Sequence, residues 1–194
     1  MLTTHASRLL AGLTAIGTCF FGGLVMATEP PGFDSIDPVA YREMFVDAVH
    51  EHQAGNKADS FRKFLRLACG GDKASQEQVG SMYLKGEGVD KSVDRGYLWL
   101  KVASEFNFAP YGAVVKQIEA LMTPEQAKYF GKLADELRAQ YGLRATNVSC
   151  RAESSTSFST KIKNAVVCSP SRNGPLLLVQ RCYAEEARVG AAAQ

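Results

Sequence analysis

The sequence predicts an all-α protein: a short right-handed α-solenoid of about three helical hairpins, with a small disulfide-tied C-terminal appendage of β or irregular structure. Three observations lead to this fold class. Apolar residues recur at helical spacing through residues 37–141, and glycines mark the breaks between segments. The same stretch matches itself when it is shifted by 35 residues. Residues 142–183 are instead rich in Ser, Thr and Val and hold three of the five cysteines.

Length and charge limit the domain count and the class of partner. A chain of 194 residues allows one domain with short additions. The net charge of +2 is too balanced to give nucleic acid a broad basic surface. The charge is nevertheless uneven, with 14 basic and 17 acidic residues in 28–141 against 7 and 3 in 142–194. We therefore expect a boundary near Gly142.

The first 27 residues indicate export. They contain no acidic residue and carry an apolar run from residue 9 to residue 26, which ends at the small residue Ala27. This pattern predicts a signal peptide over residues 1–27 and a periplasmic or secreted protein. The alternative is a retained inner-membrane anchor formed by residues 9–26, and membrane contact is expected only in that case. A lipid anchor at Cys19 is disfavoured because Thr18 precedes it.

A predicted linker at residues 28–36 is followed by a series of residues that are typical of helix starts and helix ends. Pro38 after Asp37 starts a first helix, and Asn56 starts a second that closes at two glycines. Asp72 and Ser92 are typical N-caps for a third and a fourth helix. A fifth begins at Pro110, and a capping box from Thr123 to Gln126 starts a sixth that runs to Tyr141.

The 35-residue period aligns two helices position for position. Residues 64–69 read aromatic, Leu, base, aliphatic, Ala, small, and residues 99–104 read the same. We expect Phe64 and Trp99 to fill the gaps between stacked hairpins, and Ala68 and Ala103 to let the backbones approach closely. Ala74 likewise falls on Ala109.

One unit of this period resembles the sel-one-like repeat, a relative of the tetratricopeptide repeat. The match consists of Gly71, Ala74, Gln76, Gly80, Tyr83, Gly86, Gly88, Val89, Trp99 and Ala103. Val79, Ser92 and Gly96 depart from the usual Leu, Asp and Ala. The likeness covers one repeat well and the flanking units partly. It implies an adaptor or assembly role in the bacterial envelope. We expect the contact positions for a partner among exposed polar residues of the third helix: Gln76, Glu77, Gln78 and Lys85.

Loss of the leader would remove Cys19 and leave an even number of cysteines: Cys69, Cys150, Cys168 and Cys182. Their spacing matches neither a zinc pattern nor a CxxC redox motif. In an oxidising compartment we expect disulfides, with one bridge among the last three cysteines. The alternative for Cys69 is a buried free thiol on an apolar helix face.

No motif in the chain predicts catalysis, a metal or a cofactor. In His50-Glu51-His52 the two imidazoles point to opposite sides of a helix and cannot share one ion from it. The nearby carboxylates are expected to form a solvated helix face or to hold a basic segment: Asp34, Asp37, Glu43, Asp47 and Glu51. The basic residues of the C-terminal part could meet a lipid or glycan, but Phe158 and Tyr183 are too few aromatics for nucleic-acid stacking.

These observations predict a non-catalytic exported repeat protein that acts as a scaffold or adaptor for another protein or peptide. The alternative is a small secreted or periplasmic inhibitor or immunity-type binder that uses a disulfide-tied loop at Ser169–Pro175. A small hydrolase is the least favoured class. Residues 184–194 are expected to form a flexible tail.

Overall fold

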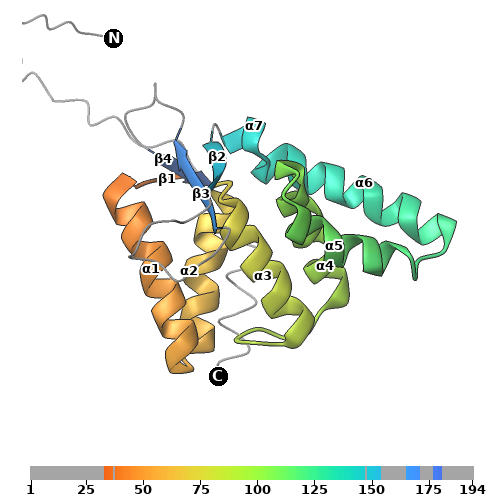
Figure 1. Cartoon of the computed structure of the whole chain (residues 1–194), viewed down its shortest axis with the longest axis horizontal. Helices are drawn as coiled ribbons and strands as arrows, with labels where there is room; N and C mark the ends of the chain where they lie inside the picture. Colours follow the sequence, from red (N-terminus) through yellow and green to blue (C-terminus); the bar gives the residue numbers. More distant parts are fainter. Residues whose placement is uncertain (1–32, 37, 147, 154–164, 171–176, 181–194) are drawn as a thin grey trace, which may run out of the picture.

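A computed structural model of the chain describes residues 33–36, 38–146, 148–153, 165–170 and 177–180 (Figure 1). The predicted signal peptide, the predicted tail and Cys182 lie outside these residues. Within them, six helices of eleven residues or more follow one another along the chain. They are α1 (Pro38–Ala54), α2 (Lys57–Cys69), α3 (Lys73–Lys85), α4 (Val93–Ala103), α5 (Ala109–Glu119) and α6 (Pro124–Tyr141). The prediction of a mostly helical protein is therefore confirmed.

The helices pack largely in chain order. Each of the first four contacts the next, whereas α6 lies mainly on α4 and reaches α2. A short 3-10 helix, η1 (Ser104–Phe106), follows α4, and a single turn, α7 (Leu143–Thr146), follows α6. The helices α1, α3 and α5 begin at residues 38, 73 and 109, so successive starts are 35 and 36 residues apart.

Local capping explains where three of these helices begin. The side chains of Asp72 and Ser92 accept backbone N–H bonds from the residue three positions on, as N-caps do. Thr123 and Gln126 form the predicted capping box in both directions. Asn56 precedes α2 without a side-chain capping bond.

The loop between α3 and α4 depends on two glycines. Gly86 ends α3 in the left-handed region at φ 75°, and Gly88 follows at φ 71°. A side chain at Gly88 would also collide with the backbone of Lys57 at the start of α2. Only glycine combines this conformation with so close an approach. Val89 then packs against the main core cluster.

The main core lies between the first four helices and the end of α6. It contains Phe64 and Trp99, both almost fully buried. Phe64 meets Phe45 of α1 edge to face, with ring centroids 5.8 Å apart, whereas Trp99 stacks on Tyr141 of α6 at 5.5 Å. The two rings therefore occupy one interior and are each covered by a different helix.

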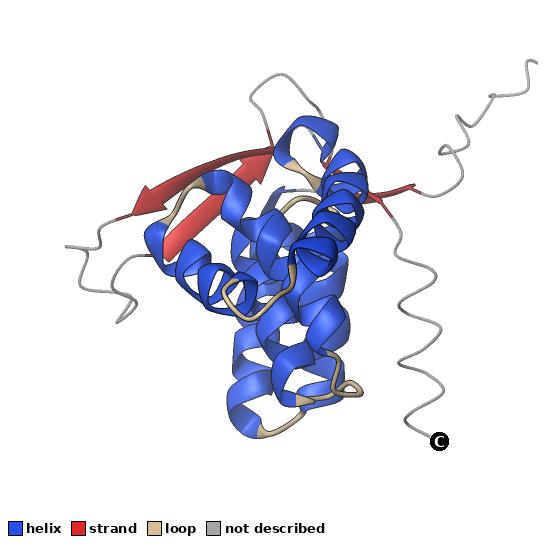
Figure 2. Cartoon of the chain, turned by 90° about the vertical axis from the view of Figure 1, so that its right-hand side faces the viewer, coloured by secondary structure: helices blue, strands red, loops and turns tan. Residues whose placement is uncertain are grey.

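Among the described residues, four short strands lie at one end of the helices (Figures 1 and 2). The strand β1 (Phe33–Ile36) pairs antiparallel with β4 (Leu177–Gln180), and β2 (Val148–Glu153) pairs antiparallel with β3 (Ala165–Pro170). The linker predicted at residues 28–36 thus contains a strand. Its pairing could not be read from the sequence because the partner strand lies far along the chain.

The strands of the C-terminal part pack mainly on the first half of the helical domain. The strand β3 contacts α3, β4 contacts α2, and β2 contacts α7. Val148 and Val166 of the β2–β3 hairpin are buried in a second cluster with Tyr41 of α1 and Tyr111 of α5. Within the described ranges, no helix combines the length and apolarity of a membrane span.

Candidate functional site

The N-terminus of α3 lies where the helices and the β2–β3 hairpin meet. Asp72 caps it by accepting the Ser75 N–H at 2.6 Å, although Asp72 itself is only 4% exposed. Burial raises the pKa of Asp72, and its hydrogen bonds with Ser75 offset part of that rise. A carboxyl group with little access to water therefore lies directly beside the hairpin.

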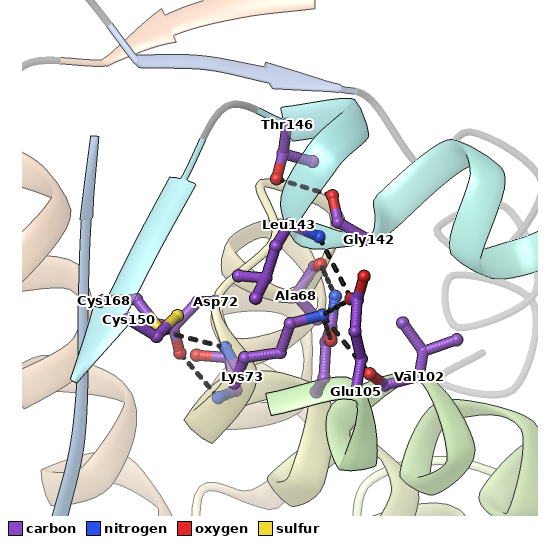
Figure 3. The surroundings of a disulfide bond; sticks show 12 residues. Ala68, Asp72, Lys73, Val102, Glu105, Gly142, Leu143, Thr146, Cys150 and Cys168 are labelled. Atoms are coloured by element: carbon purple, nitrogen blue, oxygen red, sulfur yellow. Dashed lines mark hydrogen bonds and ion pairs between the residues drawn. A yellow bond between two sulfur atoms is a disulfide. The ribbon is translucent and has the colours of Figure 1, made fainter. Parts of the chain in front are cut away.

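Lys73, the next residue, is fully buried (Figure 3). Its Nζ donates to Gln76 Oε1 at 2.8 Å, to Glu105 Oε2 at 2.8 Å and to the Val102 carbonyl at 3.3 Å. Burial lowers the pKa of Lys73, and the Glu105 carboxylate opposes that effect. The ammonium group thus bonds α3 to the end of α4 and to η1.

Gln76 extends this network to α2 and α6. Its Nε2 donates to the Ala68 carbonyl at 2.9 Å and to the Tyr141 carbonyl at 2.8 Å. Because Gln76 is fully buried, its assignment as an exposed contact position was wrong. The sequence placed it on the third helix but could not determine which way its side chain faces.

Glu105 completes the network at its solvent side. Its Oε2 also accepts the Leu143 N–H at 3.1 Å, which anchors α7. One ion pair and its neighbours therefore join α2, α3, α4, η1, α6 and α7. We name this group, Lys73, Gln76 and Glu105, the junction network.

The disulfide Cys150–Cys168 joins directly opposite residues of β2 and β3. The backbone N–H of Lys73 donates to Cys168 Sγ at 3.3 Å, so this sulfur lies against the first turn of α3 (Figure 3). Cys168 is 7% exposed and Cys150 is partly buried. The predicted bridge among the last three cysteines is thereby confirmed.

Cys69, the last residue of α2, is also disulfide-bonded, so the free-thiol alternative was wrong. Its partner is neither Cys150 nor Cys168, since these two are bonded to each other. Export to an oxidising compartment accounts for both bonds, but the compartment remains a prediction.

Two tyrosines, Tyr41 of α1 and Tyr111 of α5, are buried in the cluster that contains the hairpin. Burial, followed by the nearby Asp72 carboxyl, raises the pKa of Tyr41. Burial also raises the pKa of Tyr111, with further contributions from Glu77 and Asp72. We name the surface formed by Tyr41, Leu67, Ala103 and Tyr111 the tyrosine face. Val148, Val166 and Cys168 of the hairpin are buried in the same cluster, so the hairpin packs on this face.

The remaining predicted contact positions lie on α3 outside the junction network. Lys85 is exposed, whereas Glu77 and Gln78 are half-buried and bonded to each other, with Gln78 Nε2 donating to Glu77 Oε2 at 3.0 Å. Burial raises the pKa of Glu77, and Lys85 partly offsets that rise. These three side chains are accessible, and their binding role stays a prediction.

His50 and His52 both lie near the end of α1. His52 Nε2 lies 3.0 Å from Glu87 Oε2, in the loop after α3, while His50 is exposed. No group of three metal-ligating side chains occurs within the described parts of the chain. Of the nearby carboxylates, Glu51 and Asp47 both pair with Lys63 of α2, at 2.7 and 3.8 Å, so they face the neighbouring helix.

Comparison with protein-family models, with curated proteins and with solved structures found no match to this chain. The site must therefore be interpreted from its own chemistry. Sequence reasoning missed Lys73 and Glu105. A signal was present, because a lysine in the first turn of a helix is unfavourable to the helix dipole and calls for a partner.

Proposed function

We propose that this protein is a non-catalytic exported scaffold or adaptor that holds a protein or peptide partner, with its helices forming a short right-handed α-solenoid related to sel-one-like repeats. The bacterial periplasm or the secreted fraction is its proposed location. The helices supply the binding surface, and the junction network keeps their arrangement fixed.

The observation that carries this proposal is the recurrence of helix starts. The first helices of three successive pairs begin 35 and 36 residues apart, within one residue of the 35-residue shift of the internal sequence match. Phe64 and Trp99, one period apart, are both interior. Stacked helix pairs of this length commonly present their first helices as one continuous binding surface.

The chemistry of the buried ionisable groups supports a structural use of these groups. Lys73 is fully buried, and its ammonium donates to one acceptor on α3 itself, Gln76, and to two on α4 and η1. A substrate in solution would have to displace these bonds to reach it. The group therefore fits a role in holding helices together better than a role in proton transfer.

The partner is expected along the accessible part of α3. Gln78 and Lys85 offer an amide and an ammonium group there, and Glu77 adds a carboxyl. Such a mixed polar set suits an extended peptide that donates and accepts main-chain hydrogen bonds.

Affinity capture from envelope extract tests the proposal. The mature chain is compared with a double variant, Gln78→Ala with Lys85→Glu, and with a control that exchanges the exposed pair Lys132 and Glu136 of α6. We expect the α3 variant to lose a specific partner and the α6 control to keep it. A partner that survives both changes, or a chain that captures none, would contradict the proposal.

The inhibitor alternative depends on a loop that lies mainly outside the described residues. Deleting residues 143–194 is a poor test of it, because Val148 and Val166 are buried against the tyrosine face. Replacing residues 171–174 with glycine and serine changes the loop and leaves those contacts in place. Loss of binding after this replacement alone would favour the inhibitor.

A further inference from the structure

The β2–β3 hairpin has one apolar side and one disulfide between its two strands. Along β3, Val166 and Cys168 are buried, while Val167 and Ser169 are more accessible. Along β2, Val148 is buried and Ser149 is exposed. Because successive strand residues point to opposite sides, one side of the hairpin rests on the tyrosine face and the other meets solvent.

We propose that Cys150–Cys168 is a reducible latch, and that its reduction by a dithiol uncovers the tyrosine face. The use of that face for a partner rests on the proposed function above, but the latch itself does not. The inference adds regulation to the binding surface: the oxidised protein carries its own hairpin on part of it.

The two sulfurs differ in a way that fixes the direction of attack. Cys150 is the more accessible, so an incoming thiolate meets its Sγ first. Cys168 Sγ accepts the Lys73 N–H from the first turn of α3, where amide dipoles stabilise negative charge. Cys168 is therefore the better leaving group.

The reaction balances with a dithiol as the reductant. Its first thiolate forms a bond to Cys150 Sγ, the Cys150–Cys168 bond breaks, and Cys168 leaves as a thiolate. The second thiolate of the reductant then attacks its own sulfur in the mixed disulfide and releases Cys150. The reductant ends as a disulfide, and its two protons end on the two cysteines.

Loss of the bond is expected to loosen the hairpin. A two-stranded sheet is marginally stable by itself, and this disulfide closes a segment with a sequence separation of 18. Breaking the bond that closes such a loop is expected to increase the equilibrium constant for local opening of the hairpin on the order of 100-fold. The buried side chains beneath, Tyr41 and Tyr111, then become accessible.

The leaving-group step is tested by removing one N–H. Lys73 is the first residue after the cap, where proline fits, and Asp72 has the extended conformation (ψ 114°) that a following proline requires. Lys73→Pro and Lys73→Ala both lose the ammonium, but only the proline loses the N–H. Both are made with Glu105→Gln, so that no carboxylate is left without its partner.

We expect dithiothreitol to reduce Cys150–Cys168 about three to ten times more slowly in the proline variant than in the alanine variant. A faster or equal rate in the proline variant would overturn the leaving-group assignment. A destabilised hairpin would be reduced faster, so slower reduction cannot come from poorer folding. Asp72 opposes the thiolate by its charge, and Asp72→Asn, which keeps a capping side chain, is expected to speed reduction by a similar factor.

The uncovering step is tested by tyrosine nitration and mass spectrometry on the full chain. The variant Cys150→Ser with Cys168→Ser keeps the disulfide of Cys69, and we expect it to nitrate Tyr41 and Tyr111 at least tenfold faster than the oxidised protein. Tyr129, which is 61% exposed, should react equally in both. Equal protection of the two buried tyrosines would refute the latch. Since no partner enters this assay, its failure is distinct from a failure of the binding proposal.

Discussion

Substitution of four helical glycines by alanine tests the packing of α3 on α4 most directly. A Cβ added at Gly80 would lie 2.7 Å from Leu100 Cγ and 3.0 Å from the Gly96 carbonyl oxygen. A Cβ at Gly96 would lie 2.6 Å from Leu84 Cδ2 and 3.0 Å from the Gly80 carbonyl oxygen. The two helices therefore meet backbone to backbone at this pair, and neither carbonyl can move aside without shifting a helix.

Two other glycines serve as matched controls. Gly112 of α5 and Gly131 of α6 are also helical, and a Cβ there would meet nothing within 4 Å. Each Gly→Ala change gains about 1 kcal/mol of helix propensity. At Gly80 and Gly96 this gain is opposed by overpacking, which costs about 1–3 kcal/mol of stability.

We therefore expect Gly112→Ala and Gly131→Ala to raise the free energy of unfolding, and Gly80→Ala and Gly96→Ala to lie about 2 kcal/mol below them. For a domain of this size the gap corresponds to roughly 4–8 °C in Tm, measured by circular dichroism. If Gly80→Ala stabilises the protein as much as Gly112→Ala, the close approach of α3 and α4 is refuted.

Three further predictions concern the junction network, the neighbouring residue Asp72 and the cysteines. Lys73→Met should lower the free energy of unfolding by about 3 kcal/mol in urea titrations, and adding Glu105→Gln should recover part of that loss, because the half-buried Glu105 carboxylate otherwise loses its ammonium partner; an additive double variant would contradict this. Burial raises the pKa of Asp72 in the folded protein above its ordinary value of 3.8. The free energy of unfolding therefore falls as the pH rises from that value through the raised pKa, because the buried carboxyl group becomes charged. Asp72→Asn should therefore be more stable than the wild type at pH 7, with a Tm difference that shrinks toward pH 4, and a constant difference would disprove the assignment. Non-reducing peptide mapping should pair Cys69 with Cys182, because β4 ends two residues before Cys182 and contacts α2; any other partner would be inconsistent with that expectation.

Signals that act within one helical turn were readable from the sequence. The caps at Asp72, Ser92 and Thr123 each involve a residue three positions away, so the sequence contained both partners of each bond. The glycines at 86 and 88 were likewise predictable, because the local conformation requires them. These features place the helices without reference to the rest of the fold.

Features that depend on distant contacts were not readable. Gln76 was expected on the surface, yet it bonds the carbonyls of Ala68 and Tyr141, and the latter is 65 residues away. The ion pair of Lys73 with Glu105 joins groups 32 residues apart. The repeat pattern gave no indication of either, because a period reports which helices are equivalent and not which side chains bridge them.

The hairpin was anticipated as a disulfide-tied element but not in its position. Its valines gave a strand pattern, whereas the surface that receives it is formed by Tyr41 and Tyr111 on helices far apart in the chain. The departure of Gly96 from the alanine of the repeat pattern does have a local explanation. Leu84 occupies the space that a side chain would need.

The pairing of β1 with β4 sets an order on folding. Phe33 lies opposite Gln180, so the first described strand has no partner until Gln180 has been synthesised. The helices need only their neighbours and can assemble while the chain is still being made. Closure of this sheet is therefore a late event, and a truncated or stalled product would leave an unpaired strand edge open to association with other chains.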